Sequence, residues 1–168
     1  MKLLAAIAAG IMLMAGTAGA AERPPAPDGG IDLLCKKYST IYIKNAASVK
    51  TFRAILKVES NDGEYLVGIY DPSFGISQLK IKAVKHAAEY WSIPIPVSDD
   101  KIVWRLIQDN DFSIKMGAAY YGMLLNIFKN SEIAAIAYNI GMGKVKRLQK
   151  EGHPLPTTYI NKIRNRID

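Results

Sequence analysis

The chain has few of the residue types that build disulfide, metal or redox sites. Its 168 residues include one cysteine and two histidines. A single cysteine excludes an intramolecular disulfide, so packing must stabilise the fold. One Cys and two His also offer no metal-ligand spacing, and we predict neither a metal nor another cofactor. Cys35 is expected to be a small buried apolar side chain, and His86, His153, Trp91 and Trp104 are interpreted as structural.

Long hydrophobic runs are also absent, except at the start of the chain. Lys2 precedes an apolar run over 3–15, and an A-x-A cleavage pattern ends at Ala20. The run is shorter than the ~20 residues that a membrane span needs. We therefore predict a cleaved signal peptide at 1–20 and an exported protein of the periplasm or cell envelope, with an uncleaved anchor as the alternative. Three prolines and a glycine pair in 21–30 predict an extended leader.

Negative charge is in the minority. The chain has 22 Lys and Arg against 15 Asp and Glu, a net charge of +7. Much of the excess lies near the end, at Lys144, Lys146, Arg147, Lys150, Lys162, Arg164 and Arg166. A basic exported domain suits an anionic partner such as cell-wall polymer or a lipid surface. Without interleaved aromatic residues or a reading motif, we do not expect nucleic acid binding.

The chain after the signal peptide and leader indicates one domain, 31–168, with apolar residues at helical spacing through most of its length. Tyr65, Val67 and Ile69 instead alternate with period two, as in a strand. We predict the α+β class, predominantly α-helical, with one small β excursion. Gly117 lies inside a long apolar helix, where it suggests close packing.

Two helix starts follow from local residue chemistry. Ser48 is a candidate N-cap for the helix that leads to Glu59, because a serine hydroxyl can accept from an unpaired amide at a helix start. The next helix is predicted to begin at Ser77.

One acidic residue stands where an apolar residue is expected. Phe52, Ile55, Leu56 and Glu59 fall at i, i+3, i+4 and i+7, so on a helix they share the face that turns to the core. A carboxyl group on that face loses hydration, which raises its pKa and suits it to general acid catalysis. The alternative is that Glu59 marks the frayed helix end and points to solvent.

Three short motifs occur in one order along the chain. Glu59-Ser60 ends a helix, a Gly-Ile-Ser-Gln-Leu run at 75–79 opens the next, and an Ala-Tyr-Asn-Ile-Gly run at 137–141 ends a later one. Together they resemble the lytic transglycosylase family with its lysozyme-like domain, over about 31–163. A Gly-Ala-Ala-Tyr run at 117–120 and a Thr-Tyr-Ile run at 158–160 extend the resemblance. The chain departs from the family where Ile76-Ser77 replaces Leu-Met, and the 61–74 loop has no residue-by-residue match.

The resemblance implies a lysozyme-like fold of the goose type and a reaction. The reaction is cleavage of the β-1,4 bond between N-acetylmuramic acid and N-acetylglucosamine of peptidoglycan, leaving 1,6-anhydro ends. Glu59 would act first as the acid and then as the base. The glycan strand is the expected partner, a monomer the expected state, and the small size of the chain makes a secretion apparatus a second candidate partner.

Further site residues are expected around Glu59. Ser60 could hydrogen-bond the acid or the substrate. Gly75 would allow a tight turn and a close approach to a ligand. Gln78, at a helix start, has an amide suited to sugar hydroxyl and N-acetyl groups. For each, an ordinary role in the turn or on the helix surface is the alternative.

Aromatic residues would complete the site. Tyr138 is predicted to place its ring and hydroxyl against Glu59, so that the acid is desolvated and oriented. Asn139 would close its helix or reach an N-acetyl group. Tyr120 and Tyr159 are candidates for cleft walls, although aromatic residues at helical spacing often belong to the core.

Other functions fit the same residues. A lysozyme-type hydrolase would use water as acceptor, and a two-carboxylate version would recruit a second acid from Asp62, Glu64 or Asp71. A non-catalytic wall-binding or secretion-assembly factor would use mainly the basic end of the chain. A membrane-active protein would bind lipid through the segment after Lys144.

Overall fold

The structure is a computed structural model, and it describes residues 30–167. Over this range the elements are α2 (Gly30–Tyr42), α3 (Ala46–Ser60), β1 (Val67–Gly68), β2 (Ser73–Phe74), α4 (Ile81–Trp91), α5 (Asp99–Gln108), α6 (Asn110–Phe128), α7 (Ser131–Ile140), α8 (Met142–Lys150) and α9 (Thr158–Arg164). The predominantly helical α+β prediction is confirmed. Because α2 begins at Gly30, that residue is not part of an extended leader. The predicted signal peptide and the leader up to Gly29 lie outside the described residues.

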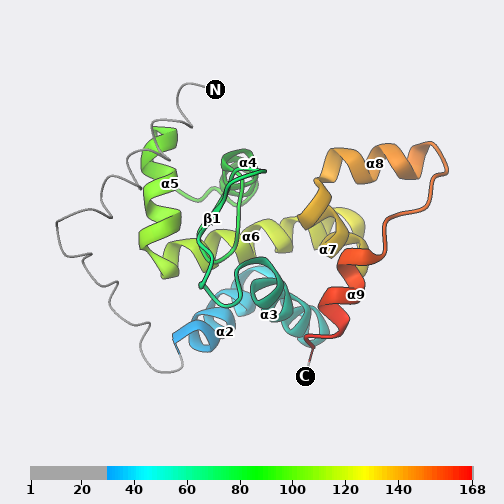
Figure 1. The fold of residues 1–168 in the computed structure, drawn as a ribbon, viewed down its shortest axis with the longest axis horizontal. Coiled ribbons are helices and arrows are strands. Elements are labelled where there is room, and N and C mark those ends of the chain that lie inside the picture. Colours follow the sequence, from blue (N-terminus) through cyan, green and yellow to red (C-terminus); the bar gives the residue numbers. More distant parts are fainter. Residues whose placement is uncertain (1–29, 168) are drawn as a thin grey trace.

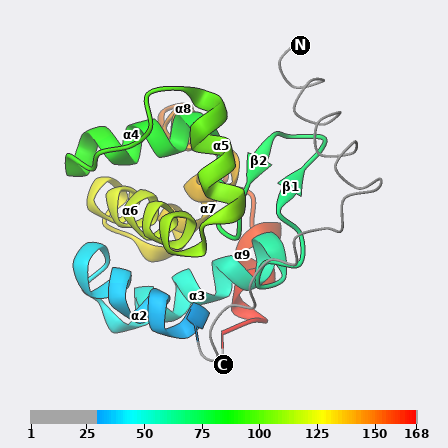
Figure 2. The same ribbon diagram turned by 90° about the vertical axis from the view of Figure 1, so that its left-hand side faces the viewer.

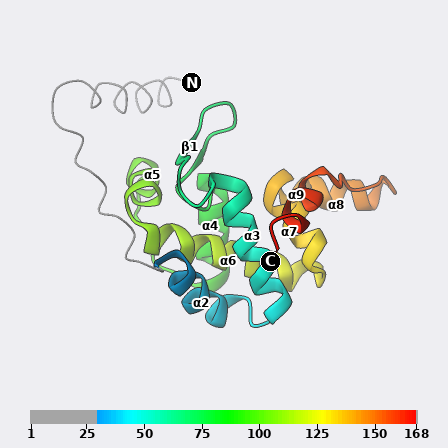
Figure 3. The ribbon, with the colours of Figure 1, turned by 60° about the horizontal axis from the view of Figure 1, so that its bottom comes forward.

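Helix α6 runs through the middle of the domain. In Figure 2, α4 and α5 lie on one side of α6, and α2 and α3 lie on the other. Helices α7, α8 and α9 gather at one end of the domain (Figure 1). Figure 3 shows α9 near α3 and α7, and both helices contact it. This arrangement brings the C-terminal ends of α3 and α7 to the same region.

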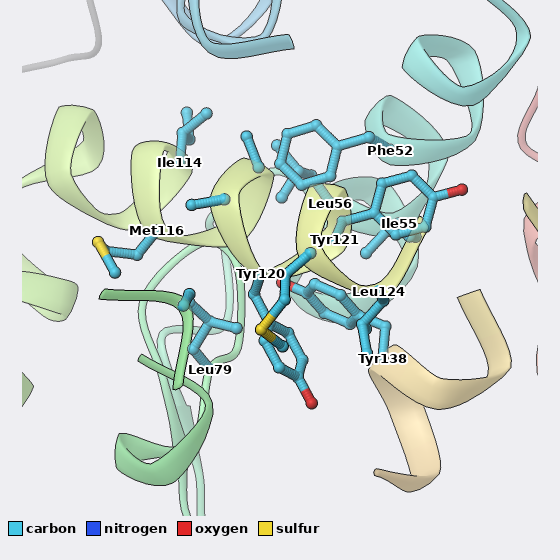
Figure 4. Packing of buried hydrophobic residues seen from close by; sticks show 14 of the residues in the cluster. Phe52, Ile55, Leu56, Leu79, Ile114, Met116, Tyr120, Tyr121, Leu124 and Tyr138 are labelled. Atoms are coloured by element: carbon cyan, nitrogen blue, oxygen red, sulfur yellow. The ribbon is translucent and has the colours of Figure 1, made fainter. Parts of the chain in front are cut away.

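The position of α6 follows from its apolar sequence. Asp109 caps its start by accepting a hydrogen bond from the Phe112 amide at 3.0 Å. Most of its side chains are buried, including Ile114, Met116 and Leu124, which are fully enclosed. Figure 4 shows side chains of α3 and the Leu79 side chain packing on α6 from different sides. Burial of this apolar surface is the main force that stabilises the domain.

Two glycines let neighbouring segments come close to α6. A Cβ on Gly117 would lie 2.4 Å from Ser77 Oγ, and one on Gly122 would lie 2.4 Å from the Tyr42 carbonyl oxygen of α2. The close packing predicted at Gly117 is therefore confirmed. Its neighbour is the loop before α4, and the close backbone approach between helices occurs at Gly122 instead.

The β excursion is shorter than the period-two pattern predicts. Strands β1 and β2 pair antiparallel over two residues each, with Val67 opposite Phe74. Tyr65 and Ile69 lie outside β1, and both are exposed. The alternating residues 65–69 therefore form a strand only at Val67 and Gly68. A two-stranded ladder buries too little side-chain surface to stabilise a longer strand.

Both predicted helix starts are wrong in position. The N-cap of α3 is Asn45, whose side-chain oxygen accepts from the Ser48 amide at 3.1 Å. Ser48 therefore lies in the first turn, where it receives the cap. The helix predicted from Ser77 begins at Ile81, and Lys80 precedes it without a side-chain cap. Residues 75–79 form a turn instead, in which Gln78 has a φ of 43°.

Other sequence-based expectations concern the core and the surface. Cys35 is 3% exposed, and burial raises the pKa of its thiol to about 12, so it is an un-ionised core residue. Within 30–167 there is no helix long and apolar enough to cross a membrane. The same residues contain no cluster of His, Cys, Asp and Glu side chains able to hold a metal ion.

Candidate active site

Glu59 lies in the last turn of α3, on the face predicted from its spacing. Phe52, Ile55 and Leu56 are fully buried on that face, and Glu59 is half-buried at its end. The carboxyl group lines a cavity of ≈ 420 Å³, which we call the cleft. Glu59 is therefore enclosed by protein on most sides and open on one. The frayed, solvent-pointing alternative does not describe this position.

The cleft is formed by five parts of the chain: α3, the segment from the β hairpin to α4, α6, α7 and the start of α8. Its lining residues are Glu59, Asp71, Ser73, Gln78, Leu79, Lys80, Lys82, Ala83, His86, Tyr120, Tyr138, Asn139, Ile140, Gly141, Met142 and Gly143. Five predicted site residues, namely Glu59, Gln78, Tyr120, Tyr138 and Asn139, are thus brought to one cavity. The mixture of tyrosine, amide and carboxyl groups suits a ligand rich in hydroxyl and amide groups.

The hydroxyl that contacts the acid comes from Tyr159 in α9. Tyr159 donates a hydrogen bond to Glu59 Oε1 at 2.5 Å across 100 positions of sequence. Tyr159 is 8% exposed and does not line the cleft. It lies behind the carboxyl group and orients it, in place of the predicted role as a cleft wall.

Tyr138 lies near Glu59, but its hydroxyl points elsewhere. It donates to the Ser77 carbonyl oxygen at 2.7 Å. The predicted contact between this hydroxyl and the acid is therefore not made. Burial, with the charge of Glu59 as the next cause, holds the pKa of Tyr138 well above its ordinary value. The ring remains a lining group of the cleft and fixes the end of α7 to the turn before α4.

The electrostatic surroundings of Glu59 favour its protonated form. Burial raises the pKa of the Glu59 carboxyl, whereas the Tyr159 hydrogen bond and the charge of Lys162 lower it, and the net shift is upward. A raised pKa means that the carboxyl keeps its proton to higher pH than an exposed glutamate does. The Tyr159 donor at the same time stabilises the carboxylate that proton transfer would leave. Burial thus favours the protonated form of Glu59, and the Tyr159 hydrogen bond offsets part of the cost of its carboxylate form.

Tyr120 and Asn139 direct polar groups toward the cleft. The Tyr120 and Tyr138 ring centroids lie 5.4 Å apart. Burial raises the pKa of Tyr120 to about 12, so its hydroxyl is protonated at neutral pH. Asn139 is exposed in the last turn of α7. Neither side chain has a hydrogen-bond partner within the described part of the chain, so both can bond a ligand.

Gln78 reaches the cleft from a turn. Its Oε1 accepts from Ser73 Oγ at 2.9 Å, and its Nε2 donates to the carbonyl oxygens of Gly75 at 2.9 Å and Tyr65 at 3.1 Å. Both amide protons are thus used within the protein. An additional acceptor site on Oε1 remains for a ligand donor. The predicted donor role toward a sugar is not available in this arrangement.

Ser60 and Gly75 lie behind the cleft and do not line it. Ser60 is fully buried, donates to the Ile76 carbonyl oxygen at 2.7 Å and accepts from the Gly63 amide at 2.9 Å. It bonds neither the acid nor the open cavity. Gly75 has a φ of +74°, and a Cβ there would lie 2.1 Å from the Leu106 carbonyl oxygen. Its close approach is to α5, not to a ligand-binding space.

The lining also includes residues whose site position the sequence analysis missed. His86, interpreted above as structural, lies on the cleft wall with Lys82, four residues earlier on α4. Their i, i+4 spacing directly after the Gly-Ile-Ser-Gln-Leu run was an available signal. Of the other residues interpreted as structural, Trp91 donates from Nε1 to the Ala119 carbonyl at 2.8 Å, whereas Trp104 and His153 are exposed.

Comparisons with known proteins identify a family and a similar fold. The profile of the family described as Transglycosylase SLT domain matches residues 41–160. Among solved structures, the fold is similar to that of an inactive mutant of the lytic transglycosylase Slt from Pseudomonas aeruginosa, with a TM-score of 0.57, 22% identity, and coverage of 84% of this chain.

That similarity concerns the fold, and the chain spans 21% of the length of the Pseudomonas protein. No curated protein sequence matches the chain significantly. The family profile, in contrast, covers most of the chain and includes all three sequence motifs. The chain therefore belongs to the transglycosylase SLT domain family.

Proposed function

We propose that the protein is a peptidoglycan lytic transglycosylase with Glu59 as its general acid and general base. The observation that carries this proposal is the position of the Glu59 carboxyl in the cleft, with its pKa raised by burial and Oε1 bonded to the Tyr159 hydroxyl. Membership of the SLT family supports the reaction class. The similar Pseudomonas protein is itself called a lytic transglycosylase.

The proposed reaction needs one carboxyl group in two successive steps. Protonated Glu59 gives its proton to the glycosidic oxygen, the bond between that oxygen and muramic C1 breaks, and the N-acetylglucosamine side leaves as an alcohol. The resulting carboxylate then takes the proton of the muramic C6 hydroxyl as O6 bonds to C1. The glutamate ends protonated, the product is a 1,6-anhydro sugar, and no water is consumed.

The surroundings of Glu59 support both steps. Its raised pKa retains the proton that the first step uses, and Tyr159 stabilises the carboxylate that the second step uses. Tyr120, Asn139 and the Gln78 oxygen supply polar groups for the N-acetyl and hydroxyl groups of the two sugars. The tyrosine rings restrict water around the acid.

A two-carboxylate hydrolase is less well supported, because the three candidate second acids are engaged elsewhere. Asp71 lines the cleft but forms an ion pair with Lys80 at 2.6 Å. Asp62 is bound by the Arg53 guanidinium, and Glu64 accepts from Asn61. Neither Asp62 nor Glu64 lines the cleft. A one-carboxylate reaction matches this distribution better.

We also propose that the protein is exported and acts in the cell envelope, because its proposed substrate lies there. We further propose that it acts as a monomer. A role beside a secretion apparatus would follow if a strain lacking the protein secreted less. Failure of that strain to show any secretion defect would limit the protein to wall turnover.

The product decides between the candidate functions. Purified sacculi would be digested with the protein, and the soluble products would be analysed by mass spectrometry. A transglycosylase releases products with anhydro ends, lighter by one water than the reducing ends that a hydrolase makes. Reducing ends would contradict the proposal in favour of a lysozyme-type hydrolase. Sacculus binding without any release would favour a non-catalytic wall-binding factor.

A further inference from the structure

One wall of the cleft carries positive charge that the proposed chemistry does not use. Lys82 and His86 are four residues apart on α4, so they lie on one face of the helix, and both line the cleft. Neither forms a hydrogen bond or ion pair within residues 30–167. Lys85, on the same helix, is absent from the lining and pairs with Asp99 at 2.6 Å.

The remaining charges of the cleft do not neutralise this wall. Its acidic residues are Glu59 and Asp71. Glu59 has a raised pKa and bonds Tyr159, and Asp71 pairs with Lys80 at 2.6 Å. The lining from α7 and α8, residues 139–143, contains no acidic side chain. The Lys82 ammonium group therefore has no protein counter-charge in the cleft, and the His86 imidazole lies one helical turn away as a hydrogen-bonding group.

The neighbouring part of the lining leaves room for a ligand beside the sugars. A Cβ added to Gly141 or Gly143 would meet no atom within 4 Å. These glycines thus face open space, and packing does not explain their lack of side chains. Asn139, next to them, is exposed and unpartnered within the described residues. The cleft accordingly continues past the tyrosines into an open region.

Resting on the proposed function, we propose that Lys82 and His86 form a subsite for a carboxylate of the peptide stem on the muramic acid unit. The repeating sugars themselves carry no charge once the muramic lactyl group is in amide linkage to the peptide. The carboxylates of peptidoglycan then lie on the stems, and these are the groups that the Lys82 ammonium attracts and that the His86 N–H can hydrogen-bond. The protein would consequently cleave strands with stems faster than bare strands.

The test compares two substrates that differ in their stems. Soluble glycan strands with peptide stems would be compared with bare strands, from which an amidase has removed the peptide and in which the freed lactyl carboxyl group has been converted to a neutral methylamide. The two strands would be cleaved separately, and kcat/KM measured for each. We expect a ratio of about fivefold in favour of strands with stems, the upper end of what one exposed charge pair contributes. The ratio should shrink when salt is added, because exposed charges are screened.

Variants test whether Lys82 and His86 cause the preference for strands with stems. The double variant Lys82→Gln/His86→Gln should lower the ratio to near one. The matched variant Lys85→Gln removes a charge from the same helix outside the cleft and should keep the wild-type ratio. Strands whose stem carboxylates are amidated should be cleaved at the rate of bare strands, which identifies the carboxylate as the group recognised. Melting curves would show that each variant is folded.

The outcomes separate the subsite from the proposed function. A double variant with the wild-type ratio would overturn the subsite, and anhydro products in the same digests would leave the transglycosylase proposal intact. If the wild type cleaved neither substrate, the proposed function would fail. Calorimetric affinities of Glu59→Gln protein for the two strands would still decide on the subsite, because equal affinities overturn it and a preference that requires Lys82 and His86 supports it.

Discussion

Glu59 and Ser60 are neighbours in sequence and belong to opposite regions of the molecule. The cleft face holds Glu59 and polar groups that reach a cavity. The region behind it, which we call the backing, holds Ser60, Gly75 and Ser77, all buried and bonded or packed within the protein. One motif thus contains a residue suited to chemistry and a residue that holds the turn. Four substitutions test how far the two regions are separate.

The largest effect is expected on the cleft face, from Glu59→Gln. Glutamine keeps the shape and can accept from Tyr159, but it cannot give or take the proton, so turnover of sacculi should fall about a thousandfold. Because burial raises the Glu59 pKa, ionisation opposes folding as pH rises through that pKa, and the variant should be at least as stable as wild type above it. Muropeptide release and thermal melting measure the two quantities.

The matched control for this variant is Glu89→Gln, an exposed acid on α4. It should leave both release and melting temperature unchanged. Binding of the Glu59→Gln protein to sacculi should persist, since the cleft keeps its lining. Appreciable turnover by Glu59→Gln protein would mean that the acid has been assigned to the wrong residue.

The backing is tested by Gly75→Ala. The new Cβ would clash with the Leu106 carbonyl oxygen, and the φ of +74° is strained for alanine. We expect a loss of about 3 kcal/mol in the free energy of unfolding, measured by urea denaturation. Gly152→Ala has a comparable φ of +70°, open space around it and a position outside the cleft, so its cost should be only about 1 kcal/mol. Equal losses would show that the contact with α5 adds nothing.

Ser60→Ala should separate stability from activity one residue after the acid. It removes the donor to the Ile76 carbonyl and the acceptor of the Gly63 amide, both in a buried place. The expected cost is about 2 kcal/mol of unfolding free energy. At a temperature where the variant is folded, its kcat/KM should equal that of wild type. Lost turnover without lost stability would move Ser60 from the backing to the cleft face.

Tyr159→Phe should have the smallest effect and the most specific one. Without its hydroxyl, the Glu59 carboxylate loses a hydrogen bond that lowers its pKa, so the pKa rises further. The acid must be protonated for the first step, and the decline of kcat/KM at high pH should therefore shift to higher pH. We expect about a tenfold loss at neutral pH. Tyr90→Phe, on the exposed side of α4, should leave the pH profile in place.

Local patterns predicted much of the scaffold. The 3.6-residue spacing of apolar residues identified the helices, because burial of one face is what stabilises them. The same spacing placed Glu59 on the buried face of α3, where the structure finds it half-buried in the cleft. The family motifs predicted Gln78, Tyr138 and Asn139 as further site residues, and all three line the same cavity.

The two helix starts were misplaced by three or four residues within local sequence, whereas two of the errors at the site concern groups whose partners are distant in sequence. The Tyr159 hydroxyl bonds Glu59 and the Tyr138 hydroxyl bonds Ser77, and no local pattern distinguishes these two tyrosines. His86 was missed for a related reason. A polar residue on a helix can face a cavity or bulk solvent, and the choice depends on where α7 and α8 lie.

The contact between Tyr159 and Glu59 also determines when the surroundings of Glu59 are complete in a newly synthesised chain. The residues that line the cleft all lie between 59 and 143, so they are synthesised before α9, and the acid lacks its hydroxyl partner until α9 has been made. Contacts between residues so far apart in sequence are slow to form, because the entropy of closing the intervening loop must be overcome first. In a chain built this way, the Glu59 carboxyl group is left without its orienting hydroxyl until α9 packs against α3 and α7.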